Sequence, residues 1–287
     1  MNQKVLILGS GGLTGHQVYD YLENHSDFEL FDISQSHKFN SNTVLLDAKD
    51  EVNFLKMIRK IQPSIIINLI GVLIGRSEKE PDSAIYLNAY LPHILAKVSN
   101  ELNSKLIHIS TDCVFSGNKN TPYVEFDEKD GKGFYAKTKS MGEVIHSNHL
   151  TIRTSVIGPE LINTNEGLFD WFMHQSNQID GWTKTIWSGV STLELAKSVL
   201  WFIENDTSGL YHLTNGIPIS KYDLLEMFKR FSGKKIKINR VDGINEDKSF
   251  VDTRNELTYQ IPNYEEMVSK MIAMTKSKSN LYKNYFL

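Results

Sequence analysis

Short apolar runs alternate with segments of helical spacing along the first half of the chain. Residues 5–8 are continuously apolar and end at a glycine, and the apolar residues of 13–22 recur at the spacing of a helix. The run IIINLI at 65–70 is rich in β-branched residues, which predicts a strand buried on both faces. The same pattern predicts further strands at 28–33, 44–46, 106–109 and 150–154, and helices at 52–61, 84–103 and 135–146.

This alternation predicts the fold class. Parallel strands need a crossover between them, usually a helix, so repeated strand–helix units favour a parallel sheet covered on both faces. We therefore expect an α/β protein with a doubly wound, Rossmann-type dinucleotide-binding domain formed by residues 1–155 and 187–207. The second of these ranges includes 192–204, whose helical spacing predicts a helix that returns to cover the sheet. Residues 156–186 and 208–287 are less regular, and we assign them to a smaller, discontinuous substrate-binding lobe.

Composition and charge narrow the class of protein. With 287 residues and 40% hydrophobic content, the chain is long enough to bury a large core. A net charge of −3 provides no general attraction to nucleic acid or to an anionic membrane. No run approaches the roughly 18 unbroken apolar residues of a membrane span, and the N-terminus lacks the apolar core of a signal peptide. A single cysteine excludes an internal disulfide and fits a reducing compartment, so we expect a cytoplasmic protein.

The stretch VLILGSGGLTGHQV places Gly9, Gly12 and Gly15 three residues apart, between the first predicted strand and the first helix. Dinucleotide-binding turns use a first glycine for the tight turn, a second for close approach to a pyrophosphate and a third for helix–strand contact. The start of the helix adds unpaired N–H groups and the positive end of its dipole. We therefore predict a dinucleotide site at these glycines and at Leu13.

Asp32 lies toward the end of the second predicted strand, twenty residues after Gly12. A carboxylate at this place accepts hydrogen bonds from the adenosine ribose and repels a 2′-phosphate, which favours NAD over NADP. His37 and Lys38 follow closely and offer compensating positive charge. The choice between NADH and NADPH therefore stays open.

A second group of polar residues follows the predicted strand at 106–109. The stretch STDCVFSG begins with Ser110 and Thr111, and FYAKTKSMGE contains Tyr135 and Lys139 four residues apart. On a helix this spacing places the phenol and the ammonium on one side. A Tyr–Lys pair of this kind also arises by chance, so its weight comes from its position after a strand end in a chain that begins with a dinucleotide turn.

Together, GxxGxxG, STDCVFSG, YAKTKSMGE and IRTSVIGPEL resemble the extended short-chain dehydrogenase/reductase superfamily, and within it the dTDP-4-dehydrorhamnose reductase family. The resemblance implies reduction of the 4-keto group of a nucleotide-linked 6-deoxy-hexos-4-ulose by NADPH or NADH, for surface polysaccharide biosynthesis. It implies Thr111, Tyr135 and Lys139 as catalytic residues, with Asn88 supporting them. It further implies cofactor contacts at Asp47, Ala48, Gly71, Tyr135 and Lys139, and substrate contacts at Thr111, Cys113 and Tyr135.

Cys113 departs from the family pattern, because many members carry an aromatic residue, usually tyrosine, at this place. The smaller side chain leaves room for a bulkier sugar, such as a UDP-2-acetamido-2,6-dideoxy-hexos-4-ulose. Phosphate groups need cationic donors, and Lys248 is the candidate for the substrate diphosphate, with Arg240 and Arg254 as further candidates.

The reaction itself needs a hydride at carbon and a proton at oxygen. Tyr135 is the predicted proton donor, and Thr111 is the predicted donor to the developing alkoxide. A phenol titrates at about pH 10, and we expect the Lys139 ammonium to lower the pKa of Tyr135 toward neutrality.

Other readings of these residues are weaker. Cys113 lacks a nearby histidine or helix end to activate it as a nucleophile. Asp112 is expected to bond nearby backbone. His146 and His149 are expected to lie at a solvated helix end, so we predict no metal site. Two rival functions stay open: an epimerase or dehydratase of the same superfamily, and a non-catalytic NAD(P)-binding regulatory subunit. The predicted partner is a nucleotide sugar, with a homodimer as the candidate assembly.

Overall fold

The apolar runs form one large parallel sheet. In the computed structural model, seven strands follow the order β11-β6-β5-β4-β1-β2-β3, and neighbouring strands in it are parallel. The predicted strands thus all belong to one sheet. They are β1 (Lys4–Leu8), β2 (Glu29–Ser34), β3 (Val44–Leu45), β4 (Ile65–Asn68), β5 (Lys105–Ser110) and β6 (Leu150–Arg153), joined by β11 (Gly209–His212).

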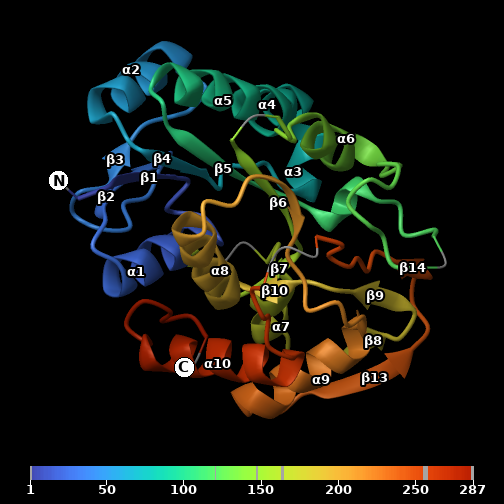
Figure 1. Cartoon of the computed structure of the whole chain (residues 1–287). Helices are drawn as coiled ribbons and strands as arrows, with labels where there is room; N and C mark the ends of the chain where they lie inside the picture. Colours follow the sequence, from blue (N-terminus) through green and yellow to red (C-terminus); the bar gives the residue numbers. More distant parts are fainter. Residues whose placement is uncertain (1, 120, 147, 163–164, 255–257, 286–287) are drawn as a thin grey trace.

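Helices cover both faces of this sheet (Figure 1). One face carries α2 (Glu51–Ile61) and α5 (Leu91–Glu101), and the other carries α1 (Gly15–His25) and α8 (Thr192–Glu204). Alternate residues of β1 enter the two apolar cores, because successive side chains of a strand point to opposite faces. The predicted doubly wound α/β fold is confirmed.

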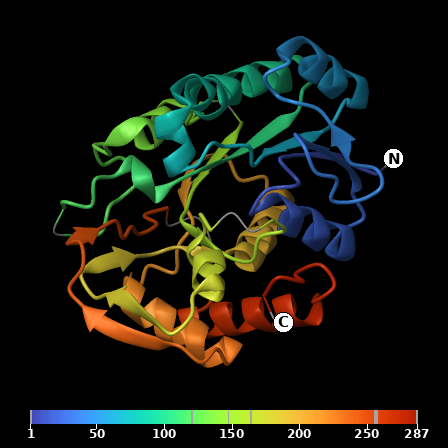
Figure 2. The same cartoon turned by 180° about the vertical axis from the view of Figure 1, so that it is seen from behind.

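Smaller sheets and helices form the rest of the molecule (Figure 2). β10 pairs with β7, β9 pairs with β12 and β14, and β13 pairs with β8. These elements are α3 (Ile74–Lys79), α4 (Pro81–Ala84), α6 (Gly133–Met141), β7 (Val156–Ile157), α7 (Leu168–His174), β8 (Gln178–Trp182), β9 (Thr185–Trp187), β10 (Val190–Ser191), β12 (Ile219–Ser220), α9 (Lys221–Ser232), β13 (Lys237–Val241), β14 (Glu246–Asp247) and α10 (Tyr264–Ser277). The structure describes residues 2–119, 121–146, 148–162, 165–254 and 258–285.

The predicted helix at 84–103 is interrupted by a π-helical turn, Ile85–Tyr90. Pro92 has no N–H with which to close the helical bond to the carbonyl of Asn88, so the regular ladder is lost there. Gly142 lies against that carbonyl: a Cβ on Gly142 would stand 1.9 Å from the oxygen of Asn88. Gly142 also caps α6, so the predicted helix at 135–146 in fact ends at Met141.

The predicted division into two units differs from the sheet at one place. β11 lies within the range 208–287 that the sequence assigns to the lobe, yet it pairs with β6 in the large sheet. The structure therefore moves Gly209–His212 to the sheet. The division of the chain into a dinucleotide-binding domain and a lobe itself stays a prediction.

The C-terminal segment packs against the first helix, α1. In Figure 2 the red C-terminal segment lies beside this blue helix. The hydroxyl of Tyr282 lies 2.9 Å from His16 Nε2 and accepts a bond from Gln17, and Lys278 pairs with Asp20. His16 Nδ1 lies 2.8 Å from the carbonyl oxygen of Gly12. The C-terminal end thus supports the glycine turn through α1.

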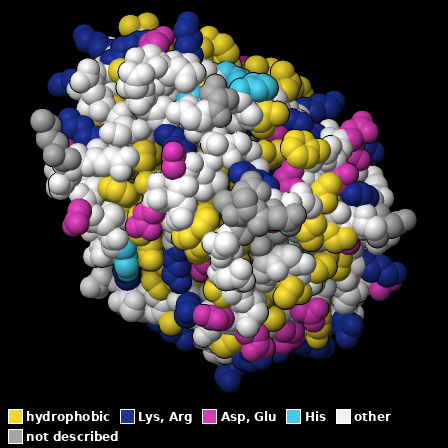
Figure 3. Space-filling view, viewed as in Figure 1, with side chains coloured by type: hydrophobic (Ala, Val, Ile, Leu, Met, Phe, Trp, Pro, Cys, Tyr) yellow, Lys and Arg dark blue, Asp and Glu magenta, His cyan; other side chains and the backbone are white. Residues whose placement is uncertain are grey.

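The mixture of charged side chains on the surface agrees with the small net charge of the chain. On the face shown in Figure 3, acidic and basic side chains are intermixed with hydrophobic and neutral ones. None of the helices in the described ranges combines the length and the apolar character that crossing a membrane would need.

Candidate active site

The glycine turn has the geometry that a pyrophosphate needs. Gly9 has a φ of +89°, and its N–H donates to the carbonyl of Ile33 on β2 at 2.8 Å. A Cβ on Gly15 would stand only 2.1 Å from the carbonyl oxygen of Gly9, so this contact admits glycine alone. Gly12 is exposed, and a Cβ there would stand 3.3 Å from the carbonyl oxygen of Gly9, so a glycine keeps the turn tight. The residues present therefore fit a dinucleotide at the start of α1.

The other predicted cofactor residues lie at the same edge of the sheet. Asp32 lies near the carboxyl end of β2, Asp47 and Gly71 follow the carboxyl ends of β3 and β4, and strand order reverses between β1 and β4. Ligands of open α/β sheets bind at such a reversal. Leu13 is half-buried in the turn itself and Ala48 is buried next to Asp47.

Asp32 is engaged by protein groups. Its carboxylate accepts from Ser10 Oγ at 2.5 Å and from Asn40 Nδ2 at 3.3 Å, and the residue is buried two positions before β2 ends. Asp47, by contrast, is half-buried and accepts from Gln35 Nε2 at 3.0 Å. The predicted contact of Asp32 with a ribose stays a prediction.

Asn88 fastens the loop that follows β4. Its Oδ1 accepts from Val72 N at 2.8 Å, and its Nδ2 donates to Val72 O at 2.9 Å and to Thr138 Oγ1 at 3.3 Å. The side chain is fully buried between this loop and α6. These contacts are those of a positioning residue, and the predicted support of the catalytic residues by Asn88 stays a prediction.

Thr111 and Tyr135 approach each other from different elements. Thr111 follows β5, where its Oγ1 donates to Asp112 Oδ1 at 3.0 Å and accepts from Cys113 N at 3.1 Å. Tyr135 lies in the first turn of α6, and the Thr111 hydroxyl is close enough to lower the pKa of its phenol. The strand-end hydroxyl and the phenol therefore lie close together, and their catalytic roles stay a prediction.

The electrostatics of the phenol differ from the prediction. Burial raises the pKa of Tyr135, the Asp112 carboxylate acts in the same direction, and the hydroxyl of Thr111 opposes them. Lys139 does not lower it, and the ammonium of Lys139 donates to the carbonyl of Ile109 on β5 at 2.7 Å. Burial in turn lowers the pKa of Lys139 to about 8. The expected lowering of the phenol pKa by the lysine is therefore wrong for this structure.

A buried ion pair holds the far end of α6. Glu143 accepts from Arg153 Nε at 2.6 Å and from Arg153 Nη2 at 2.8 Å, and also from Ser110 Oγ at 2.8 Å and Lys129 Nζ at 3.0 Å. Burial acts to raise the pKa of Glu143, but its bonds and the Arg153 charge lower it overall. The pair joins the ends of β5 and β6 to the helix that carries Tyr135.

Tyr135 and Cys113 line a cavity of about 360 Å³ between α3, α6 and the segment before β14. Lys248 and Glu246 close it from the other side, and they form an ion pair of 3.0 Å. Burial raises the pKa of the Cys113 thiol to about 12, and the charge of Asp112 adds to this. A neutral thiol at this place is a wall of the cavity and a poor nucleophile.

Comparison with known proteins decides the family. The family described as "RmlD substrate binding domain" matches residues 3–276. The chain belongs to this family. The resemblance that the motifs carry is thereby confirmed.

Three matches illustrate the range of relatives of this RmlD-family chain. The spore coat polysaccharide biosynthesis protein SpsK of Bacillus subtilis is 26% identical over 82% of this chain and 81% of its own length. The dTDP-4-dehydrorhamnose reductase of Shigella flexneri is 31% identical over 53% of this chain and 50% of its own length. The dTDP-4-dehydrorhamnose reductase of Bacillus anthracis, solved in complex with NADP, has a TM-score of 0.83 and 22% identity and covers 96% of this chain and 100% of that one, a likeness of fold.

The structure brings some predicted residues of this RmlD-family chain into the site and leaves others outside. The guanidinium of Arg254 donates to the carbonyls of Ser208 and Leu210, so it supports β11. Arg240 stacks over Tyr222 at 5.4 Å. These contacts give both arginines a structural role that requires no phosphate.

The expectation that His146 and His149 lie at a solvated helix end is wrong, because α6 ends at Met141 and His149 is buried. His146 is exposed, while His149 is buried and accepts from the backbone N–H of Leu106 at 3.2 Å. Within the described ranges, no group of three metal-binding side chains gathers.

Sequence reasoning missed Lys221. Its ammonium lies over the Trp182 ring at 5.9 Å, and its charge, like that of Lys248, lowers the pKa of Asp112, although burial raises that pKa overall. The stretch SKYD predicts a capped helix start at Ser220, and Ser220 is the N-cap of α9. No local pattern shows that the charge of the next residue acts on Asp112, which follows a strand far away in the sequence.

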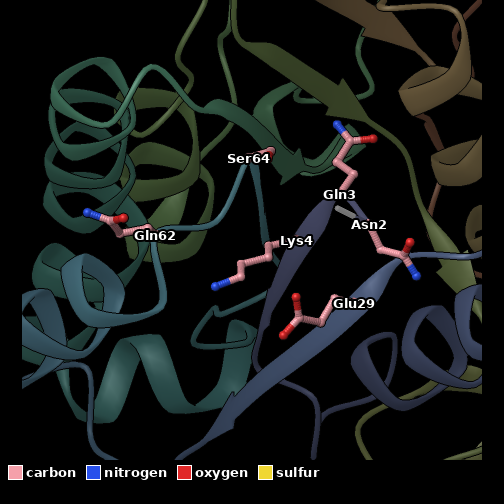
Figure 4. Close-up of a pocket in the computed structure, with 6 residues that line it drawn as sticks. All are labelled: Asn2, Gln3, Lys4, Glu29, Gln62 and Ser64. Atoms are coloured by element: carbon pink, nitrogen blue, oxygen red, sulfur yellow. The ribbon is translucent and has the colours of Figure 1, made fainter.

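A second hollow lies at the opposite edge of the sheet (Figure 4). It is found at the amino ends of β1, β2 and β4, and its lining residues are Asn2, Gln3, Lys4, Glu29, Gln62 and Ser64. Because parallel sheets of this class bind ligands at the carboxyl ends of their strands, we assign no function to this hollow.

The buried ion pair makes a stability prediction. Arg153→Met should lower the free energy of unfolding by about 3 to 5 kcal/mol, because Glu143 then stays buried without its cation. Wild-type stability should fall in acid as pH drops through the lowered pKa of Glu143, since the carboxylate form is the one that the fold stabilises. Urea unfolding followed by circular dichroism measures both effects.

The exposed pair of Arg59 and Glu101 provides the control. Arg59→Met should cost at most about 1 kcal/mol. Equal losses for the two arginine variants would contradict a special role for the buried pair.

Proposed function

We propose that this RmlD-family protein is an NAD(P)H-dependent nucleotide-sugar reductase that reduces the 4-keto group of a nucleotide-linked 6-deoxy-hexos-4-ulose. The observation that carries the proposal is the approach of the Thr111 hydroxyl to Tyr135, whose side chain lines a cavity with Cys113, on the sheet edge that also holds the glycine turn. The names of the relatives point to the same chemistry.

The cofactor, when bound, would supply a hydride to the carbonyl carbon. Gly9, Gly12 and Gly15 would hold its pyrophosphate at the start of α1, and Lys139 would contact its nicotinamide ribose. Both NADH and NADPH stay in the proposal. The carboxylate of Asp32 is shared by Ser10 and Asn40, which weakens the argument from its charge against a 2′-phosphate.

Tyr135 would donate the proton to the carbonyl oxygen. Its raised pKa keeps the phenol protonated at neutral pH, which suits a proton donor in the direction of reduction. The hydroxyl of Thr111 has a single proton, and that proton lies on a bond to Asp112. To stabilise a developing alkoxide, Thr111 must release this bond, while the N–H of Cys113 keeps the oxygen in place.

The substrate would enter the cavity with its diphosphate near Lys248 and Lys221. These cations lie on the lobe side and both act electrostatically on Asp112 at the strand end. Cys113 leaves room on the cavity wall for either a simple 6-deoxy sugar or a 2-acetamido-2,6-dideoxy sugar, so the dTDP-linked and UDP-linked ketoses are both proposed. The name of SpsK supports the further proposal that the product serves polysaccharide biosynthesis.

Rival functions predict different use of the cofactor. An epimerase or dehydratase returns the cofactor unchanged after each cycle, and a dehydratase of this superfamily carries an acidic pair where this chain has Asp112 and the neutral Cys113. A binding subunit does not need a phenol and an amine at a cavity. The presence of Tyr135 and Lys139 therefore favours an enzyme over a binding subunit, and the lack of an acidic pair at Asp112 and Cys113 favours a reductase over a dehydratase.

A panel of dTDP-, UDP- and GDP-linked 4-keto-6-deoxy sugars, each with NADH and with NADPH, tests the proposal. We expect one nucleotide class to be reduced with stoichiometric loss of absorbance at 340 nm. Product formation without loss of reduced cofactor would identify an epimerase or dehydratase. Cofactor binding without any turnover across the panel would favour the regulatory subunit.

Replacing the proton donor is the most direct mechanistic test. Tyr135→Phe should lower kcat by about a hundredfold or more, because the alkoxide loses its positioned acid. Tyr90→Phe removes a hydroxyl from an exposed tyrosine on the π-helical turn and should leave kcat unchanged. Full activity of Tyr135→Phe would overturn the assignment of the donor.

The two lysines should act on substrate binding. Lys248→Ala and Lys221→Ala should each raise the KM for the nucleotide sugar by about tenfold, since each removes a charged partner of the diphosphate. The KM for NADPH should not change. Lys235→Ala, at an exposed lysine of the lobe, is the matched control. An unchanged sugar KM in both variants would remove the lysines from the proposed subsite.

A further inference from the structure

Helix α6 begins without a cap from its own segment. Its N-cap residue, Lys132, makes no side-chain capping bond, and its first turn contains no acidic residue. The first N–H groups of a helix need partners, and one comes from another helix: Phe134 N donates to Glu78 Oε1 at 2.9 Å. Tyr135 is the next residue, so this bond lies beside the turn that carries the phenol.

The backbone before this bond is shaped for the carboxylate. Gly133 has a φ of +83°, and a Cβ there would stand 2.8 Å from Glu78 Oε1. Glycine both permits the conformation and leaves space for the oxygen. The negative charge of Glu78 also suits the positive end of the α6 dipole.

Glu78 belongs to a helix that starts at the loop holding Gly71. In α3, Ser77 N donates to the carbonyl of Leu73 at 2.8 Å, and Ser77 Oγ donates to the carbonyl of Val72 at 3.0 Å. Val72 is also the residue that Asn88 holds. The loop after β4, the short helix α3 and the start of α6 are therefore linked by consecutive hydrogen bonds.

We propose that Glu78 is a positioning residue: it caps α6 from α3. It thereby sets the place of Tyr135 relative to the loop after β4, which holds the predicted cofactor residue Gly71. The effect of this cap on turnover rests on the proposed reductase function. Glu78 and Tyr135 line the same cavity, so loss of the cap frees the phenol-bearing turn at the cavity wall. A small displacement of the donor lowers turnover more than it lowers binding.

Three variants separate the capping bond from the charge. Glu78→Ala removes both, Glu78→Gln keeps an oxygen that can accept from Phe134 N, and Glu80→Ala removes an exposed carboxylate that pairs with Arg76 near the end of the same helix. Thermal unfolding first shows that each variant is folded. Amide hydrogen exchange of residues 133–138 then reports the cap without any substrate.

We expect Glu78→Ala to exchange faster in this segment, with Glu78→Gln and Glu80→Ala close to the wild type. In the reductase assay, Glu78→Ala should lower kcat by about tenfold with little change in the KM for NADPH. Glu78→Gln should restore most of kcat, because a positional role needs the bond more than the charge.

Two results would overturn the proposal. Wild-type exchange in Glu78→Ala would show that Glu78 does not hold the start of α6. A Glu78→Gln variant as slow as Glu78→Ala would show that the bond to Phe134 is not what matters. If the wild type reduces no nucleotide sugar, the proposed function fails, while the exchange experiment still decides whether Glu78 is the cap.

Discussion

The site depends on the buried ion pair between Glu143 and Arg153. Glu143 accepts four hydrogen bonds, two from Arg153 and one each from Ser110 and Lys129, which join the ends of β5 and β6 to the segment just after α6. Together with the bond from Lys139 to the carbonyl of Ile109, this junction fixes β5, which ends just before Thr111, relative to the helix that carries Tyr135. Such a pair costs desolvation, and the fully bonded carboxylate offsets that cost.

The close contact between Gly142 and the backbone of Asn88 is the second constraint on α6, the helix that carries Tyr135. Pro92 leaves the carbonyl of Asn88 without its helical N–H partner. Only a glycine at position 142 can lie against that carbonyl. The amide of Asn88 meanwhile holds Val72 and Thr138. One residue thus fixes both the loop after β4 and the middle of α6, which places the predicted cofactor and substrate sides of the cleft together.

Burial governs the chemistry of the groups that meet there. It keeps Tyr135 protonated, brings the pKa of Lys139 to about 8 and leaves Cys113 as a neutral thiol. Spacing along a helix predicted that the amine would act on the phenol, but the carbonyl of Ile109 takes the amine instead. A sequence pattern shows which groups share a helix face, whereas their partners come from other elements.

The sequence by itself determined the parallel sheet, the glycine turn and the helix at 192–204, because each depends on local periodicity or on a backbone shape that only glycine allows. It also determined the pairing of Thr111 with Tyr135, through motifs that mark a family. Only the tertiary structure decided that β11 joins the sheet, that Asn88 and Arg254 support the backbone, and that Lys221 and Glu78 approach the site. Those contacts join residues far apart in the chain, and short-range patterns carry no information about such distances.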